Sequence, residues 1–404
     1  MKLATRLDSI EPFYVMEMAK AAREVAASPA CDPATGGEPM IYLNIGEPDF
    51  TAPPLVVAAA EACLHAGRTQ YTPSAGIPAL RQALSRWYRD RWQLDVAPDR
   101  IFITAGASAA LQLVSLALFE TGDEVLMPDP CYPCNRHFVS ATGARARLLP
   151  AGPEHRFQLD AGSVRAAWTP ATRGVLLASP SNPTGTSIEP QEMGAIVQAV
   201  RERGGTTIVD EIYLGLSYEA RYGHSALAHG GDVVSVNSFS KYFGMTGWRL
   251  GWLVLPPELV APVEKLAQNF YICASSLAQQ AAVACFEPTS LAEYERRRGE
   301  FKRRRDTVVP GLEKLGLQVP VPPDGAFYAW ADCSAVSTSS WDLCTALLHS
   351  AHVALTPGRD FGPHAADRYL RLSFASSMHE IETALVRLGR AIHRKRAVPI
   401  VTSG

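Results

Sequence analysis

The chain has 404 residues, of which 47% are hydrophobic and 19% are charged. This composition is typical of a folded globular protein, and the length allows two packed units of unequal size. The formal net charge of −2 gives no electrostatic reason to expect a nucleic acid or an anionic membrane as partner. At the N-terminus, Asp8, Glu11 and Glu17 stand where a signal peptide needs an apolar region, which predicts a cytoplasmic protein.

The predicted elements change in character along the chain. The stretch ASPACDPATGG at 27–37 is rich in proline, glycine and alanine and is typical of a loop. Between about 100 and 255, helical patterns alternate with the β-rich runs RIFIT, DEVLMP, ARARLLP, GVLLASP, TTIVDE, VVSVNSFS and RLGWLVLP. This alternation predicts a mostly parallel sheet covered by helices on both faces. After about 290, a charged helix and further strands indicate a smaller α+β unit, and the basic cluster at 296–306 is interpreted as a solvated helix face.

Polar and aromatic residues follow several of these strand-like runs, and sheets of this kind bind ligands beyond the carboxyl ends of their strands. The small residues of TAGASAAL at 104–111 begin a predicted helix, whose free N–H groups and dipole suit a phosphate. Ser238 and Arg249 can add a hydroxyl donor and a bidentate contact. Neither GxGxxG nor GxxxxGK[ST] occurs, which argues against a dinucleotide or a nucleoside triphosphate.

The other groups after these strands are an acid, Asp210, a phenol, Tyr213, an amide, Asn182, an aromatic ring, Tyr132, and an amine, Lys241. A phosphate site, a lysine that can form a Schiff base and an acidic partner for a ring nitrogen together suggest pyridoxal phosphate. Each residue also has an ordinary structural explanation, as a cap, a turn residue, core packing or a surface lysine. Their joint occurrence at strand ends favours the cofactor site.

Other kinds of site fit only parts of the pattern. SFSK at 238–241 fits the S-x-x-K signature of serine acyl-enzymes, but KTG is absent and the segment follows a strand. Cys131 and Cys134 form a CxxC pair, yet the prolines around them argue against the helix start that a thioredoxin-like pair requires. The eight cysteines lack the dense spacing of a disulfide framework, and the ten histidines show no ligand spacing, so no metal is expected.

Longer segments resemble the class I/II aminotransferases, which are fold-type I pyridoxal phosphate enzymes. These segments are NIGEPDF at 44–50, YTPSAGIPALRQAL at 71–84, SNPTG at 181–185, VDEIY at 209–213, SFSKYFGMTGWRLGW at 238–252, GAFY at 325–328, PGRDFG at 357–362 and YLRLSFA at 369–375. They follow the family's order over nearly the whole chain. The resemblance implies a mostly parallel seven-stranded sheet in a large α/β domain at 46–290. It also implies a smaller α+β domain built from 1–45 and 291–404.

The resemblance implies catalytic roles for Lys241, Asp210 and Tyr213. Lys241 would carry the cofactor as a Schiff base and move the substrate's α-proton, and Asp210 would keep the ring nitrogen protonated. Tyr213 and Asn182 would bond the phenolate oxygen of the ring, and Tyr132 would stack on its face. The resemblance therefore implies that Lys241, which follows the strand-like run VVSVNSFS, is a nucleophile.

Phosphate and substrate contacts follow from the same resemblance. Residues of one subunit that would hold the phosphate are Gly106, Ala107, Ser108, Ser238 and Arg249. Tyr71 would reach that phosphate from a second subunit, so a homodimer with shared active sites is expected. Arg371 would pair with the substrate α-carboxylate, with Asn182 and the backbone of Gly46 completing the contact.

The implied reaction moves an amino group from an L-amino acid to a 2-oxo acid. Family members that prefer aspartate or glutamate usually hold the distal carboxylate with an added basic residue. Residues 271–295 contain no Arg or Lys, and the phosphate loop has Ser108. Because a buried unpaired carboxylate is strongly disfavoured, we expect a neutral donor with an aliphatic or aromatic side chain. That expectation fails if Arg68, Arg359 or a partner-chain residue supplies the charge.

Three alternatives to transamination remain open from the sequence alone. The same fold supports β-elimination of sulfur amino acids and decarboxylation, because small shifts in substrate pose decide which bond at Cα breaks. A non-enzymatic alternative is an aminotransferase-like effector domain of a regulator. That protein would need a DNA-binding domain before the fold, whereas the residues that precede Gly46 are not basic.

Overall fold

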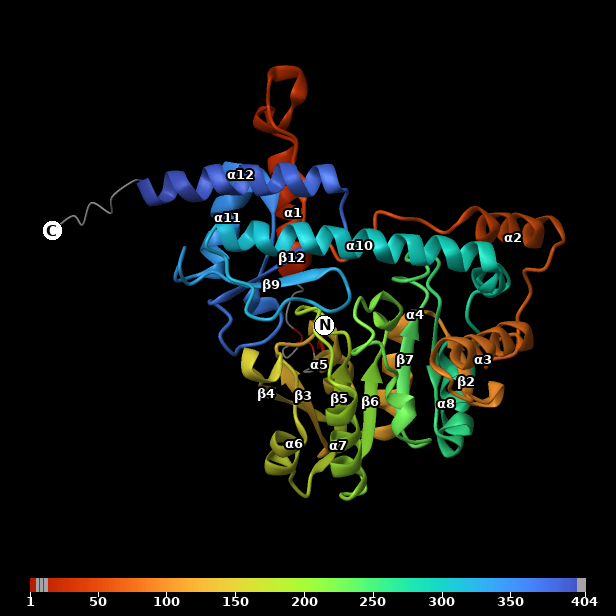
Figure 1. Cartoon of the computed structure of the whole chain (residues 1–404). Helices are drawn as coiled ribbons and strands as arrows, with labels where there is room; N and C mark the ends of the chain where they lie inside the picture. The colour runs from red at the N-terminus through yellow and green to blue at the C-terminus, as the bar shows by residue number, and fades with distance from the viewer. Residues whose placement is uncertain (5–6, 8–9, 11–13, 398–404) are drawn as a thin grey trace.

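The computed structural model describes residues 1–4, 7, 10 and 14–397 (Figure 1). Asp8 and Glu11, on which the argument about a signal peptide rests in part, lie outside these residues. Within the described ranges, no helix combines the length and the apolar character that crossing a membrane requires.

A seven-stranded sheet forms the centre of the large half of the molecule, with the order β2-β8-β7-β6-β5-β3-β4. Its strands are β2 (Ile101–Thr104), β3 (Glu124–Asp129), β4 (Arg145–Pro150), β5 (Thr172–Ala178), β6 (Thr206–Asp210), β7 (Val234–Ser238) and β8 (Gly251–Val254). Strand β8 pairs antiparallel with β2 and β7, and the remaining pairs are parallel. The predicted mostly parallel sheet is therefore confirmed, and its strands coincide with the predicted β-rich runs.

Helices cover both faces of this sheet, which explains the consecutive apolar residues in the inner strand β5. Leu176 of β5 packs with residues of one face, whereas its neighbours Val175 and Leu177 pack on the opposite face. The helices on the first face are α4 (Gly106–Leu118), α5 (Pro133–Ser140) and α8 (Pro257–Phe270). Those on the second face are α6 (Ala161–Ala167) and α7 (Pro190–Arg201).

Helix α5 corrects one expectation about the cysteine pair. Its first residue is Pro133, so Cys134 lies in its first turn and the prolines do not prevent a helix there. Proline is favoured at this position because the first N–H of a helix needs no partner within the helix. Cys131 is nevertheless buried, and burial raises the pKa of its thiol to about 12, which opposes a reactive thiolate.

The smaller half contains two short sheets and described residues from both the N-terminal and the C-terminal parts of the chain. Strands β11 (Thr356–Pro357), β12 (Tyr369–Ser373) and β9 (Tyr328–Asp332) form an antiparallel sheet. Strand β1 (Ile41–Tyr42) pairs parallel with β10 (Val353–Ala354), which joins the N-terminal segment to the C-terminal part. This pairing agrees with a small domain made from both termini, although the boundaries at 46 and 290 stay a prediction.

The remaining helices are α1 (Tyr14–Ala26), α2 (Pro54–His65), α3 (Pro78–Trp92), α9 (Ser276–Ala282), α10 (Pro288–Lys314), α11 (Ser340–Ala351) and α12 (Met378–Ala397). Short 3-10 helices are η2 (Pro29–Cys31), η3 (Pro33–Thr35), η4 (Pro98–Arg100), η5 (Pro153–His155), η6 (Leu214–Leu216), η7 (Ala226–His229), η8 (Val283–Phe286) and η9 (Gly358–Asp360). The predicted loop at 27–37 thus contains two single turns of 3-10 helix.

Helix α10 has 27 residues and crosses the molecule between the layer of α11 and α12 and the ends of β6 and β7 (Figure 1). The interpretation of its basic cluster as a solvated face is wrong in part, because Arg297 and Arg304 are buried. Arg304 donates to both carboxylate oxygens of Asp49 over 2.8 Å, and Arg297 donates to the carbonyl of Thr51 over 2.6 Å. These bonds fix the chain segment that follows Gly46.

Candidate active site

The carboxyl ends of β2, β3, β5, β6 and β7 meet at one edge of the sheet, and a cavity of about 270 Å³ lies there. Strand β2 belongs to this edge because both β2 and β7 run antiparallel to β8. The predicted residues that line the cavity are Gly46, Ala107, Ser108, Tyr132, Asn182, Asp210, Tyr213, Ser238, Lys241, Arg249 and Arg371. The fold therefore brings together residues that lie far apart in the sequence, at the edge where such sheets bind ligands.

Lys241 lies in the turn that follows β7 and is only partly exposed. This position in a turn, outside any helix, contradicts the alternative of a serine acyl-enzyme. Its Nζ donates a 2.6 Å hydrogen bond to the carbonyl of Gly46. Burial lowers the pKa of Lys241 to about 8, the nearby carboxylate of Glu47 opposes that shift, and the positive charge of Arg371 adds to it. A lysine with a lowered pKa is available as a neutral nucleophile and base near neutral pH.

Asp210 is the last residue of β6 and is 4% exposed. Its Oδ1 accepts a 3.1 Å hydrogen bond from the backbone N–H of Ile212. Burial raises the pKa of Asp210 to about 7, and the adjacent Glu211 raises it further, while Lys241 acts in the opposite direction. A cationic group placed against this carboxylate would stabilise its charged form and lower that pKa.

The N-terminus of α4 forms one wall of the cavity. A Cβ on Gly106, whose φ is +83°, would lie 2.8 Å from Nη2 of Arg249, so the guanidinium approaches the start of the helix closely. A Cβ on Gly251 would lie 2.8 Å from the carbonyl carbon of Gly106, so a glycine is also needed where β8 passes the helix. Free N–H groups, the helix dipole, Arg249 and the hydroxyls of Ser108 and Ser238 together suit a phosphate dianion.

Arg371 lies on β12 at the opposite side of the cavity and is 2% exposed. It donates to Oδ1 of Asn182 over 2.8 Å and to the carbonyl of Asn44 over 2.6 Å, with a longer bond of 3.4 Å to Thr356 Oγ1. Its Nε has no hydrogen-bond partner among the described residues. A buried guanidinium with neutral partners is suited to a carboxylate from a ligand.

Two tyrosines of the cavity lining contact each other. The hydroxyls of Tyr213 and Tyr328 lie 2.8 Å apart. Burial raises the pKa of Tyr213 well above its ordinary value, so its phenol keeps its proton and can donate to an anionic oxygen. The guanidinium of Arg371 lies 4.5 Å from the centroid of the Tyr328 ring. A Cβ on Gly46 would collide with the Tyr328 hydroxyl, so the glycine lets these groups meet.

Two of the predicted residues lie outside this lining. Gly106 borders the cavity through its contact with Arg249. Tyr71 is 79% exposed and lies away from the cavity of its own chain. That position is compatible with a reach toward a neighbouring subunit, which stays a prediction.

The sequence did not point to Val15 and Met16 of α1, which also line the cavity. The carboxylate of Asp360 holds the first turn of this helix, because it accepts from the N–H groups of Tyr14 over 2.9 Å and Val15 over 3.3 Å. No motif in residues 14–26 signals this role. Tyr328 belongs to the GAFY segment, and the sequence alone assigns no function to it.

Comparisons with known proteins agree with this geometry. Residues 38–388 match the family model described as aminotransferase class I and II. The chain is 41% identical over 381 residues to the valine–pyruvate aminotransferase of Mycobacterium tuberculosis, over 94% of this chain and 96% of that protein. An aminotransferase crystal structure from Mycobacterium tuberculosis matches with a TM-score of 0.92 and 39% identity, over 98% and 100% of the two chains. The Thermus thermophilus aspartate aminotransferase solved with maleate matches with a TM-score of 0.88 and 32% identity, over 97% and 100%.

The similarity extends along nearly the whole chain, and the proteins named above are aminotransferases. A β-lyase, a decarboxylase and a regulatory effector domain find no support among them. The expected fold, cofactor and enzyme class are therefore confirmed. The chain belongs to the class I and II aminotransferases, fold-type I enzymes that use pyridoxal phosphate to move an amino group between an amino acid and a 2-oxo acid.

Proposed function

We propose that this enzyme holds pyridoxal phosphate through Lys241 and transfers amino groups from L-amino acids with neutral side chains. The observation that carries the proposal is the convergence of Lys241, Asp210 and Arg371 on one cavity. These three residues supply an amine of lowered pKa, an acid that lacks a strong cationic partner and a cation with neutral partners.

The residues fit the cofactor on chemical grounds. The close approach of Arg249 to the start of α4 supports a phosphate site made with Gly106, Ala107, Ser108 and Ser238. Asp210, with its raised pKa, would face the ring nitrogen, whose positive charge would stabilise the carboxylate. Asn182 and Tyr213 would hold the phenolate oxygen, and Tyr132 would lie on the ring face. When bound, pyridoxal phosphate accepts the amino group and withdraws electrons from the bonds at the substrate's Cα.

Three residues of the chain would bind the substrate, move its proton and keep the ring nitrogen protonated. Arg371 would bind the α-carboxylate of the substrate and so orient its Cα toward Lys241. Lys241 Nζ would take the proton from the substrate's Cα and deliver it to C4′ of the cofactor, the carbon on the other side of the transferred nitrogen. The pKa of about 8 for this amine supports that role, because a proton carrier works best with a pKa near the working pH. The Asp210 carboxylate would keep the ring nitrogen protonated during this transfer.

An apolar wall supports the preference for a neutral side chain. Val15 and Met16 of α1, with Ile45 and Leu111, line the cavity beside these polar groups. Arg359, one of the residues that could have supplied a second charge, instead lies 4.8 Å from the Tyr14 ring centroid and 4.6 Å from that of Trp341. It lines a separate cavity. The relative named valine–pyruvate aminotransferase supports the same preference.

We also infer a homodimer with shared sites and a cytoplasmic location. Tyr71, Phe270 and Ile272 expose large apolar surfaces, and Ser74 Oγ donates to the Ile272 carbonyl over 2.6 Å, which joins the two segments. Such a patch supports an interface with a second copy. None of the eight cysteines, all of which lie in the described part of the chain, forms a disulfide, which supports a reducing compartment.

The experiment is a steady-state comparison of alanine, valine, leucine, phenylalanine, methionine, aspartate and glutamate as amino donors, with pyruvate and 2-oxoglutarate as acceptors. Each donor is also mixed with the enzyme alone, and the loss of cofactor absorbance is followed. We expect the highest kcat/KM with a neutral donor, and glutamate remains a usable second substrate. If aspartate ranks first, the proposed preference is wrong, while transamination itself stands.

A further inference from the structure

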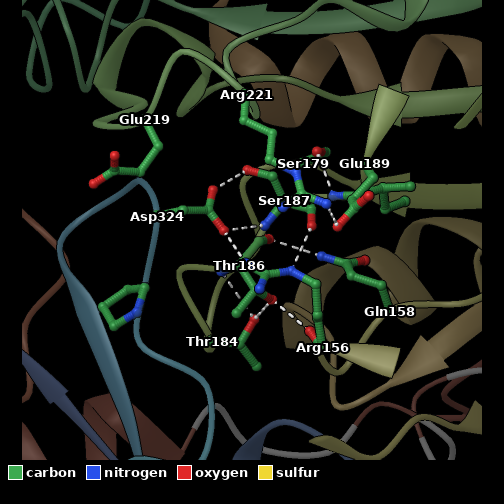
Figure 2. A network of polar contacts seen from close by, with 12 residues as sticks. Arg156, Gln158, Ser179, Thr184, Thr186, Ser187, Glu189, Glu219, Arg221 and Asp324 are labelled. Carbon is green, nitrogen blue, oxygen red and sulfur yellow. Dashed lines mark hydrogen bonds and ion pairs between the residues drawn. The ribbon is translucent and has the colours of Figure 1, made fainter. Parts of the chain in front are cut away.

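The Asp324 carboxylate lies at a contact between two loops that come from different parts of the chain (Figure 2). It precedes β9 and is 2% exposed. Its Oδ2 accepts from the backbone N–H of Ser187 over 2.9 Å and from Nη2 of Arg156 over 2.5 Å. The hydroxyl of Ser187 donates to its Oδ1. One carboxylate therefore binds a backbone group, a hydroxyl and a guanidinium of the large half.

Backbone contacts bring the same two loops together. The N–H groups of Asp324 and Gly325 both donate to the carbonyl of Gly185, over 2.9 Å and 3.0 Å. Gly185 has a φ of +68°, and a Cβ there would lie 2.5 Å from Cβ of Pro323 and 2.8 Å from the carbonyl oxygen of Tyr328. The loops thus touch without room for a side chain. The Asp324 carboxylate fixes how they lie relative to each other.

Each of the two loops leads to a residue that contacts the guanidinium of Arg371. The first carries Asn182, whose Oδ1 accepts from Arg371 over 2.8 Å. The second carries Tyr328, whose ring centroid lies 4.5 Å from the same guanidinium. The first loop is a closed turn from Ser181 to Thr186 that contains Asn182, because Ser181 N–H donates to the Thr186 carbonyl over 2.9 Å, and Ser187 follows this turn directly. A shift of Ser187 therefore moves Asn182 as well.

Burial disfavours the charged form of Asp324, and its pKa is raised for that reason despite the bonds from Ser187 and Arg156. A buried carboxylate with no role is often replaceable by apolar packing without loss of stability. The N–H and the hydroxyl of Ser187 belong to the loop that presents Asn182. Arg156 lies on a different loop but contacts the same one, because Thr186 Oγ1 donates to its carbonyl over 2.7 Å. The charge is thus placed where it defines geometry at the substrate side of the cavity.

We propose that Asp324 is a positioning residue for substrate binding: by holding Ser187 and Arg156 it sets the distance between Asn182 and Arg371 and so the site for the substrate α-carboxylate. This inference rests on the proposed role of Arg371. Asp324 touches neither the substrate nor the cofactor, and it acts through the loop that contains Asn182.

The test measures binding of isovalerate, a carboxylate that resembles a neutral amino acid without its amine, to the cofactor-loaded enzyme by calorimetry. KM and kcat for the amino donor are measured beside it. Asp324→Asn replaces an acceptor oxygen by an NH2 group and removes the charge that faces Arg156. Because small misplacements away from the chemistry cost up to about 100-fold, we expect the Kd for isovalerate and the KM to rise by about 10-fold or more. We expect kcat to change by a smaller factor.

Glu189→Gln is the matched control. Glu189 pairs with Arg221 over 2.6 Å in the same network, but both residues belong to the large half and lie at the surface (Figure 2). This variant keeps the wild-type Kd for isovalerate in our account. Ser187→Ala removes one donor to Asp324, leaves its charge in place and shifts the same constants in the same direction. In the variant that combines Asp324→Asn with Ser187→Ala, the change in the free energy of isovalerate binding differs from the sum of the two single changes.

A folded Asp324→Asn enzyme with a wild-type Kd for isovalerate overturns the inference, as does an equal shift in Glu189→Gln. If Asp324→Asn does not fold, Ser187→Ala decides, and unchanged constants in that variant overturn it. If wild-type enzyme neither binds isovalerate nor transaminates, the proposed function fails. If wild-type enzyme does both and Asp324→Asn has wild-type constants, the proposed function stands and the positioning role alone is wrong.

Discussion

Arg371 donates a 2.8 Å hydrogen bond to Oδ1 of Asn182, and this bond joins β12 to the loop after β5 in the lining of the cavity. The two residues lie 189 positions apart in the sequence. Because the guanidinium is buried and bound to neutral oxygens, an incoming carboxylate meets a cation that is already oriented.

Arg371→Lys tests this orientation. A lysine keeps the charge but loses the planar fork, so it cannot hold Asn182 and a carboxylate in the same geometry. We expect a loss of about 2 kcal/mol, or roughly 30-fold in kcat/KM, carried mainly by KM. Arg368→Lys is the control, because Arg368 precedes the same strand but is half-exposed and paired with Asp332. Equal losses in both variants would contradict the role of Arg371.

Asp210→Asn tests the acid at the ring nitrogen. An amide at this position cannot keep a proton on that nitrogen, so the ring withdraws electrons from Cα less strongly. We expect the single-turnover rate of α-proton removal to fall by orders of magnitude, while circular dichroism and cofactor content stay close to those of wild type. A near-normal rate in a fully loaded variant would show that another residue performs this function.

The stability of the cofactor-free enzyme should depend on Asp210 and pH. Its pKa is about 7 in the folded protein against an ordinary 3.8, so its contribution to stability is present below about pH 4 and is lost as pH rises through about 7. Asp210→Asn does not titrate. The variant should therefore gain in Tm relative to wild type between these pH values, measured by thermal unfolding without cofactor. A Tm difference that is independent of pH would refute the assignment.

Tyr71 tests the shared sites. Mixing Tyr71→Phe with Lys241→Ala subunits, followed by dissociation and reassociation, should produce heterodimers in which one of the two sites has both wild-type residues. We expect activity above that of either parent, measured with the best donor. Sedimentation at assay concentration checks the oligomer, and an active monomer there would end the claim of shared sites.

The strands and the strand-end residues were predictable because both follow from local sequence. An apolar run such as GVLLASP is buried on both faces, and the parallel order of β5, β6 and β7 brings Asn182, Asp210 and Lys241 to one edge. The cofactor could be inferred from chemistry, since few ligands require an amine, an acid and a phosphate site together. The roles of the individual residues came from the resemblance to the aminotransferases.

What could not be predicted depends on contacts between distant segments. Val15 lies in the cavity because Asp360, 345 positions away, binds the first turn of α1. Arg304 appears in the sequence as one more residue of a basic run, and only its bond to Asp49 shows that it is buried. The environment of Asp324 was equally unpredictable, because nothing in the neighbouring sequence indicates that Ser187 lies beside it.

The covalent site is tested most directly by borohydride reduction of the purified enzyme followed by peptide mapping. The account predicts a yellow protein whose absorbance is lost on reduction, with the label on the peptide that contains Lys241. Lys265→Ala, which changes an exposed lysine of α8, should label as wild type does, whereas Lys241→Ala should neither label nor transaminate. A label on any lysine other than Lys241 in the wild-type enzyme would contradict the central claim.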